Sequence, residues 1–190
     1  ARMQSVDTDA QFVYNENGLR VKKTVNGVVT DYTLHGKNVV HMTRESDELH
    51  FFYDAQNKPA VVIFNGIAYA YLYDLQGDVI GLVDNNGTQM VSYTYDAWGK
   101  MLSKTGTLAS TLGTIQPFRY RGYALDEETE LYYNQSRFYN PSIARFITAD
   151  TTGVLTASLK SLTEKNLFAY CDNNPVMRKD IDGASVSYTH

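Results

Sequence analysis

The stretch that decides the fold, residues 118–183, begins FRYRGYALDEETELYYNQSRFYNPSIARFI and ends CDNNPVMRKDIDG. Aromatic and arginine residues alternate in it with a period of two, as in Phe118-Arg119-Tyr120-Arg121. That period is typical of a strand with one solvated face and one packed face. Segments 150–153 and 180–183 both begin with Asp and have Gly in the fourth position, which is typical of tight turns. The stretch therefore predicts strands closed by two acidic turns.

Upstream, residues 12–102 contain a repeat in which an aromatic pair is followed by Asp or Asn and then Gly. Copies recur about every 20 residues, the length of one strand–turn–strand unit. The aromatic pair places two rings on one strand face, the acid starts a turn, and Gly supplies the positive φ that closes it. The clearest copies are Phe12–Asn15, Phe51–Asp54, Tyr71–Asp74 and Tyr93–Asp96, with a weaker one at Tyr32–His35.

Between these copies lie the pairs Asn26-Gly27, Asn65-Gly66 and Asn86-Gly87. Asn-Gly is a strong signal for a two-residue hairpin turn. The sequence thus predicts an all-β fold, a continuous antiparallel sheet of hairpins. Residues 105–117 are expected to form a polar connecting loop, and residues 126–130 a solvated hairpin tip.

One segment, residues 154–170, has the leucine spacing of a helix, and we expect a short helical segment there.

Composition agrees with a β-rich fold, since 15 Tyr and 13 Gly stand against 4 Pro. The net charge of −4 argues against a nucleic-acid partner, which requires a basic surface. Cys171 is the only cysteine, so the chain has no internal disulfide. No apolar run reaches the roughly 20 residues of a membrane span. The polar start of the sequence contains no export signal, so we expect any such signal to lie upstream.

Common catalytic motifs are absent from the sequence, including phosphate-binding loops, HExxH, GxSxG and CxxC. The four histidines share no ligand spacing, so neither a metal nor another cofactor is expected. The histidines are His35, His41, His50 and His190.

The order of motifs in residues 118–183 resembles the RHS repeat-associated core domain of bacterial RHS/YD-repeat toxins. The Tyr-Asp repeat resembles the YD repeat and extends the likeness to residues 12–183. The matching core motifs are Phe118-Arg119, Tyr132-Tyr133-Asn134, Arg137-Phe138-Tyr139-Asn140-Pro141, Arg145-Phe146-Ile147, Asn166-Leu167-Phe168-Ala169-Tyr170, Asn173-Asn174-Pro175 and the two acidic turns.

The resemblance implies a sheet that curves as part of a hollow shell. It divides the chain into YD repeats (1–104), a connector (105–117), the RHS core (118–184) and a short tail (185–190). The implied function is that of a shell segment in a secreted or cell-surface bacterial toxin. Its partners would be upstream shell repeats and a C-terminal effector or toxin domain enclosed by the shell.

In this family the two turn aspartates converge, and the shell cuts its own chain after the second acidic turn. The resemblance implies Asp150 and Asp180 as the catalytic pair and Ala184–Ser185 as the cleaved bond. Spacing suggests Arg145 as the cation that holds the ionised aspartate. At most an autoproteolytic aspartyl activity is expected, with none on external substrates.

Three positions depart from the family pattern at this implied site. Thr151 and Ile181 stand where the family has Pro, and Ala184 stands where it has Leu. Asp182 adds a third carboxylate to the second turn. The other interpretation of both aspartates is structural, since Asp in such a turn often binds only backbone N–H groups.

An alternative function also fits the composition. Exposed faces of tyrosine rings suit stacking on sugars, so the chain could instead be a non-catalytic module that binds carbohydrate or the cell wall.

Overall fold

The computed structural model describes residues 9–135, 137–147, 169–180 and 186–188. The chain packs as two units, of which one ends at Tyr69 and the other begins at Ala70. Each unit is built from antiparallel strands, as the sequence predicts.

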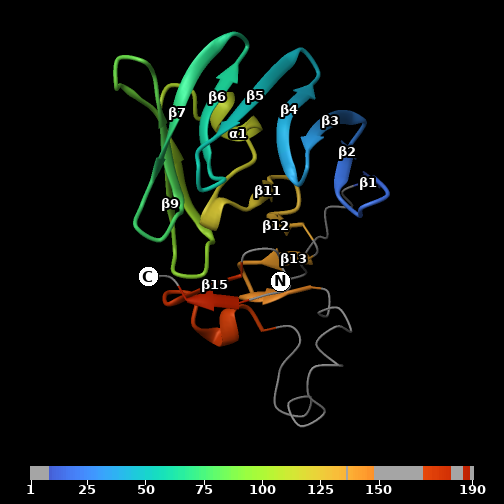
Figure 1. The fold of residues 1–190 in the computed structure, drawn as a ribbon, viewed down its shortest axis with the longest axis vertical. Coiled ribbons are helices and arrows are strands. Elements are labelled where there is room, and N and C mark those ends of the chain that lie inside the picture. Colours follow the sequence, from blue (N-terminus) through green and yellow to red (C-terminus); the bar gives the residue numbers. More distant parts are fainter. Residues whose placement is uncertain (1–8, 136, 148–168, 181–185, 189–190) are drawn as a thin grey trace, which may run out of the picture. The chain divides into compact units, whose positions relative to one another are not determined.

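In the first unit each strand from β1 to β6 pairs antiparallel with its neighbours along the chain. Neighbouring strands such as β4, β5 and β6 lie side by side (Figure 1). Alternate residues are buried, so one face of the sheet carries Met42, Leu49, Phe51 and Val62. The strands are β1 (Ala10–Tyr14), β2 (Arg20–Val25), β3 (Val28–His35), β4 (Asn38–Arg44), β5 (Asp47–Tyr53), β6 (Pro59–Phe64) and the start of β7 (Ile67–Tyr73).

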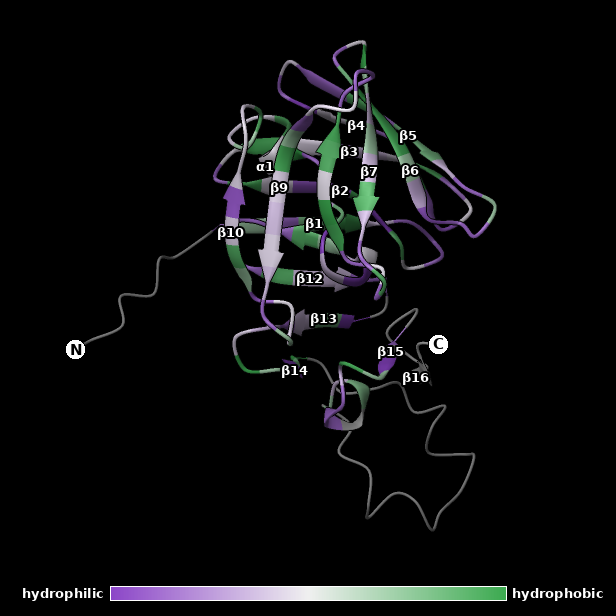
Figure 2. Ribbon diagram, turned by 90° about the vertical axis from the view of Figure 1, so that its left-hand side faces the viewer, coloured by the Kyte–Doolittle hydropathy of each residue, from purple (hydrophilic) through white to green (hydrophobic). Residues whose placement is uncertain are grey.

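Two kinds of turn connect these strands. At Asn26-Gly27 and Asn65-Gly66 both residues have positive φ, as a two-residue hairpin of type I′ requires. The longer turn between β5 and β6 is hydrophilic (Figure 2) and is organised by Asp54. Its Oδ1 accepts hydrogen bonds from the N–H groups of Gln56 and Lys58, at 2.9 and 2.8 Å. The predicted role of the repeat's Asp is therefore confirmed.

The same Asp turn recurs in the second unit after Asp74, Asp84 and Asp96. The prediction of a two-residue hairpin at Asn86-Gly87 is wrong. There Asp84 accepts bonds from the N–H groups of Asn86 and Thr88, and only Gly87 has positive φ. The carboxylate two residues earlier converts an Asn-Gly pair into part of a longer turn.

The second unit contains the rest of β7 and three further strands of the same ten-stranded sheet, together with a four-stranded sheet and a two-stranded sheet. Several members of the four-stranded sheet, β11 to β13, are labelled in Figure 1. The elements are β8 (Val79–Val83), β9 (Gln89–Tyr95), β10 (Met101–Thr105), α1 (Leu112–Ile115), the 3-10 turn Tyr120–Gly122, β11 (Ala124–Asp126), β12 (Leu131–Asn134), β13 (Arg137–Asn140), β14 (Arg145–Phe146), the 3-10 turn Cys171–Asn173, β15 (Arg178–Asp180) and β16 (Val186–Tyr188).

The start of the stretch 118–183 is not the half-solvated strand that its alternation of aromatic and arginine residues predicts. Residues 120–122 form a 3-10 turn in which Arg121 has a φ of 55°. Arg119 and Arg121 are 0% and 1% exposed, so the expected solvated face does not exist there. The alternation does produce strands further on, at β12 and β13.

Two smaller expectations need correction, and others fall outside the described residues. The connector 105–117 contains the short helix α1. The hairpin tip after β11 is not solvated at its start, because Asp126 is buried. Nearly all of the predicted helix 154–170 lies outside the described residues; within it, Ala169 forms a β-bridge with Arg145. The division into four sequence segments stays a prediction.

Among the described residues, no helix combines the length and the hydrophobicity that crossing a membrane would require.

Candidate functional site

Tyrosine rings fill the core of the second unit. Tyr139 and Tyr170 lie closest, with ring centroids 4.1 Å apart, and Tyr132 stacks on Tyr139 at 6.3 Å. Such contacts stabilise a core beyond simple burial. The buried cluster consists of Tyr120, Tyr123, Leu125, Tyr132, Tyr139, Phe146, Tyr170 and Cys171, with Tyr95, Trp98 and Met101 packed against it.

Three of these tyrosines bind the turn that closes the last YD repeat. The Asp96 turn presents three successive carbonyl groups, and a different hydroxyl donates to each. The pairs are Tyr120 to Ala97 at 3.0 Å, Tyr139 to Trp98 at 2.8 Å and Tyr132 to Gly99 at 2.8 Å. These hydrogen bonds join the stretch 118–183 to the repeat that precedes it.

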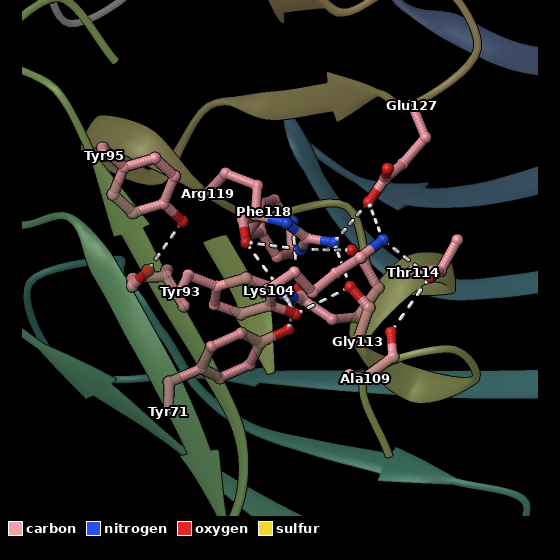
Figure 3. A network of polar contacts seen from close by, with 12 residues as sticks. Tyr71, Tyr93, Tyr95, Lys104, Ala109, Gly113, Thr114, Phe118, Arg119 and Glu127 are labelled. Atoms are coloured by element: carbon pink, nitrogen blue, oxygen red, sulfur yellow. Dashed lines mark hydrogen bonds and ion pairs between the residues drawn. The ribbon is translucent and has the colours of Figure 1, made fainter. Parts of the chain in front are cut away.

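Arg119 lies at the centre of a buried polar network (Figure 3). Its guanidinium carbon sits 4.3 Å from the centroid of the Tyr93 ring, in a cation–π contact. Its N–H groups donate to the backbone carbonyls of Gly113, Gln116 and Phe118. An arginine of the stretch 118–183 is thus hydrogen-bonded to the connector 105–117.

Glu127 supplies the negative charge for this network. One carboxylate oxygen lies 3.3 Å from Nη2 of Arg119 and 2.9 Å from Nζ of Lys104. Lys104 also donates to Oγ1 of Thr114 at 2.8 Å (Figure 3). Glu127 therefore turns inward, which explains why the start of the hairpin tip is not solvated as expected.

Arg121 joins the Asp74 turn to a distant motif. Its guanidinium donates to the carbonyl and side chain of Gln76, at 2.7 and 2.9 Å, and to the carbonyl of Pro175. Its own N–H donates to Oδ1 of Asp78 at 2.8 Å. The positive φ at Arg121 is the backbone conformation in which these bonds are made.

Asp180 is the one predicted catalytic aspartate that lies in the described part of the chain. Its side chain is 0% exposed, and Oδ2 lies 2.7 Å from Nη2 of Arg137. Its backbone carbonyl accepts hydrogen bonds from the hydroxyl of Tyr123 and from Nδ2 of Asn134, the latter at 3.2 Å. Arg137 lies over the Phe146 ring at 3.6 Å. The carboxylate is therefore buried and held by a cation in a fixed position.

The predicted partners of Asp180 are not gathered around it in the described part of the chain. Asp150, Ala184 and Ser185 lie outside the described residues, so the aspartate pair and the cleaved bond stay predictions. Arg145 is exposed in β14, opposite Asn140.

The cation bound to Asp180 is Arg137, which the sequence analysis did not single out. A signal for it was present in the period-two pattern of β13. That pattern puts Arg137 on the same face as the buried Tyr139.

Burial keeps the tyrosine hydroxyls and the cysteine thiol of this core protonated. Burial raises the pKa of Tyr120 to about 12 and that of the Cys171 thiol to about 11. It raises the pKa of Tyr123 well above its usual value. The hydroxyls around Asp180 are therefore hydrogen-bond donors at neutral pH, and Cys171 is a thiol, a poor nucleophile.

Comparison with known proteins agrees with this architecture. A family model described as teneurin YD-shell matches residues 38–176. The tRNA3(Ser)-specific nuclease WapA of Bacillus spizizenii is 38% identical over 178 residues, which are 92% of this chain and 7% of that protein. The double-stranded DNA deaminase toxin A of Burkholderia cenocepacia is 27% identical over 209 residues, covering 95% of this chain and 14% of that protein.

Solved structures show the same fold. The crystal structure of TcdB2-TccC3-TEV superposes with a TM-score of 0.69 at 20% identity, covering 96% of this chain and 9% of that one. The structure of the Photorhabdus luminescens Tc holotoxin pore gives a TM-score of 0.66 at 17% identity, covering 100% of this chain and 10% of that one.

Antiparallel hairpins with recurring Asp turns, closed by a tyrosine and arginine core, define the class as an RHS/YD-repeat shell. The chain belongs to the teneurin YD-shell family. It spans only 7% of the length of the WapA relative and 14% of the length of the deaminase toxin.

Proposed function

We propose that this chain is part of the shell of a secreted or cell-surface bacterial polymorphic toxin, and that the shell encloses a C-terminal effector. The family match and the two relatives support this, since one is named a tRNA nuclease and the other a DNA deaminase toxin. Both relatives are many times longer than this chain, so they have room for further repeats and an effector. Repeats of this kind bury their faces by stacking on neighbours.

We further propose that the shell cleaves its own chain at Ala184–Ser185 by using Asp180. The observation that carries this proposal is the buried carboxylate of Asp180, which is bound by Arg137. Asp180 lies four residues before Ala184 in the sequence. A bound cation favours the ionised form of a carboxylate, so Asp180 is the base of the pair. Asp150, the predicted acid, would then stay protonated beside it.

The reaction is hydrolysis of one peptide bond. Asp180 accepts a proton from a water molecule, and the water oxygen bonds to the carbonyl carbon of Ala184. Asp150 donates a proton to the nitrogen of Ser185 as the carbon–nitrogen bond breaks. A new carboxylate remains on Ala184 and a new amine on Ser185, so the effector is separated while still enclosed.

The test is intact-mass measurement of a chain extended by its native C-terminal sequence. We expect two fragments that separate at Ala184–Ser185, and one uncut chain for Asp180→Asn and for Asp150→Asn. Asp54→Asn is the matched control and should cleave normally, because Asn can accept the same two turn hydrogen bonds. An uncut parent chain, or normal cleavage in Asp180→Asn, contradicts the proposal.

Enclosure is tested separately, on the whole protein with its upstream repeats. After cleavage, the effector fragment should co-elute with the shell in gel filtration and resist added protease. Separation of the two fragments without denaturant contradicts enclosure but leaves the cleavage result standing.

A further inference from the structure

Two histidines and a glutamate meet on one face of the β4–β5 hairpin in the first unit. His41 on β4 lies directly opposite His50 on β5, and Glu48 lies two residues before His50 on the same face. The two imidazole rings stack, with centroids 4.5 Å apart. This face is opposite to the buried one that carries Leu49.

The three side chains direct their ligand atoms to one point. Nε2 of His41 lies 2.9 Å from Oε1 of Glu48, and Nε2 of His50 lies 3.3 Å from the same oxygen. All three atoms lie within 4.8 Å of one another. Ligands about 2.0–2.2 Å from a tetrahedral ion are themselves roughly 3.3–3.6 Å apart, so small side-chain rotations suffice to seat an ion.

The surroundings suit a bound ion that remains open to solvent. The side chains of His41, His50 and Glu48 are 28%, 46% and 56% exposed, so an ion can reach all three. The Glu48 backbone is also fixed, because its N–H donates to Oδ1 of Asn65 at 2.9 Å. Antiparallel pairing fixes the other two positions.

We propose that His41, Glu48 and His50 form a binding site for a divalent transition-metal ion of the zinc type. Two neutral imidazoles and one carboxylate are a ligand set that zinc uses, with a fourth position left for water or another ligand. Imidazole ligands select zinc, copper or nickel over magnesium or calcium. The ion joins β4 to β5 and so stabilises the hairpin against opening. Sequence spacing conceals the site, since strand pairing brings the ligands together.

Zinc chloride is the probe, titrated by calorimetry into the chain purified without a histidine tag. We expect one ion per chain, and at least about tenfold weaker binding for His50→Gln and for Glu48→Gln, because even outer-shell changes cost 10–100-fold. His35→Gln is the matched control, since exposed His35 is outside the cluster, and it should bind as the parent does. Circular dichroism checks that each variant is folded. If His50→Gln does not fold, Glu48→Gln tests the site alone, because it changes an exposed side chain.

Cobalt provides a second readout, because a bound tetrahedral ion has visible absorption that Glu48→Gln should weaken or abolish. The absence of saturable one-to-one zinc binding overturns the proposal. Equal zinc affinity in the parent and in both ligand variants also overturns it. Binding of calcium as tight as that of zinc would overturn the assignment to a transition metal.

Discussion

At the scale of single residues, the second unit depends on three buried guanidiniums. Arg119, Arg121 and Arg137 each lie over an aromatic ring. Each also has a carboxylate within 3.6 Å. Burial of a charge is costly unless the charge is paired and hydrogen-bonded. Removal of one member of such a pair therefore harms the fold more than removal of both.

Arg137→Gln should lower the free energy of unfolding by about 3–5 kcal/mol, because it leaves Asp180 buried without its cation. The double variant Arg137→Met/Asp180→Leu should recover much of that loss. Urea unfolding followed by circular dichroism measures both. Arg145→Gln, at an exposed arginine of the neighbouring strand, is the control and should change stability by less than about 0.5 kcal/mol. Equal losses in Arg137→Gln and Arg145→Gln would show that the buried ion pair is unimportant.

Cys171 should be chemically quiet in the folded chain. It is 0% exposed, and burial raises the pKa of its thiol to about 11. At pH 8 roughly one thiol in a thousand is then ionised, and the thiolate is the reactive form. Alkylation by iodoacetamide should be slow in buffer and fast in guanidinium chloride, as read by mass spectrometry. Fast labelling of the native chain would contradict the burial of Cys171.

At the scale of elements, the Asp turns are alike in backbone and unlike in what touches them. Gly87 and Gly99 have φ values of 79° and 86°, and each follows a turn aspartate by three residues. A Cβ at Gly87 would meet no atom within 4 Å, whereas a Cβ at Gly99 would lie 2.4 Å from the Tyr120 ring. The same substitution therefore separates backbone strain from a packing clash.

Gly87→Ala should cost about 1–2 kcal/mol of unfolding free energy, the penalty for a side chain at positive φ. Gly99→Ala should cost about 1–3 kcal/mol more, because the ring of Tyr120 must move within a packed core. Thermal and urea unfolding of both variants measure the difference. Equal costs would mean that the Asp96 turn is not packed against the tyrosine core.

The elements also show why sequence predicts part of this structure. The Tyr-Asp turns are local, since the side chain of Asp54 accepts hydrogen bonds from residues within four positions of it. The Asn-Gly hairpins are local in their backbone, since two adjacent residues with positive φ make each turn. These features were predicted from the sequence and confirmed, except at Asn86-Gly87, where Asp84 changes the turn.

The buried arginines could not be predicted by the same reasoning. Arg121 binds the carbonyl of Pro175, and Arg137 binds Asp180, across 54 and 43 positions of the chain. Period-two alternation reports which residues share a face but not whether distant carbonyls will cover that face. Family resemblance predicted Asp180 as a site residue, whereas only the structure identified Arg137 as the cation that binds it.

At the scale of the whole molecule, stability should fall in alkali. Burial raises the pKa of Tyr95, Tyr132, Tyr139 and Tyr170 above their usual value, and that of Tyr120 to about 12. The protonated phenol is the form that the fold favours. The stability from these shifts is therefore complete below pH 10, where unfolded tyrosine is still protonated. It is lost as the pH rises from 10 towards the folded values.

Circular dichroism should show unfolding above about pH 10, steeper than for a protein with exposed tyrosines. Absorbance at 295 nm should show a group of tyrosines that ionise together with that loss of structure. Ionisation of all tyrosines near pH 10 with the fold intact would contradict the buried cluster.

The three hydroxyls on the Asp96 turn also have a consequence for biosynthesis. The ribosome synthesises the Asp96 turn before it synthesises Tyr120, Tyr132 and Tyr139. Until those residues emerge, the Asp96 turn of the nascent polypeptide lacks these three hydrogen bonds, and its carbonyls are exposed to solvent. Completion of the last repeat therefore depends on translation of the downstream tyrosines. A message truncated before the codon for Tyr120 yields a product that lacks these three hydrogen bonds, and its Asp96 turn stays accessible to chaperones and proteases.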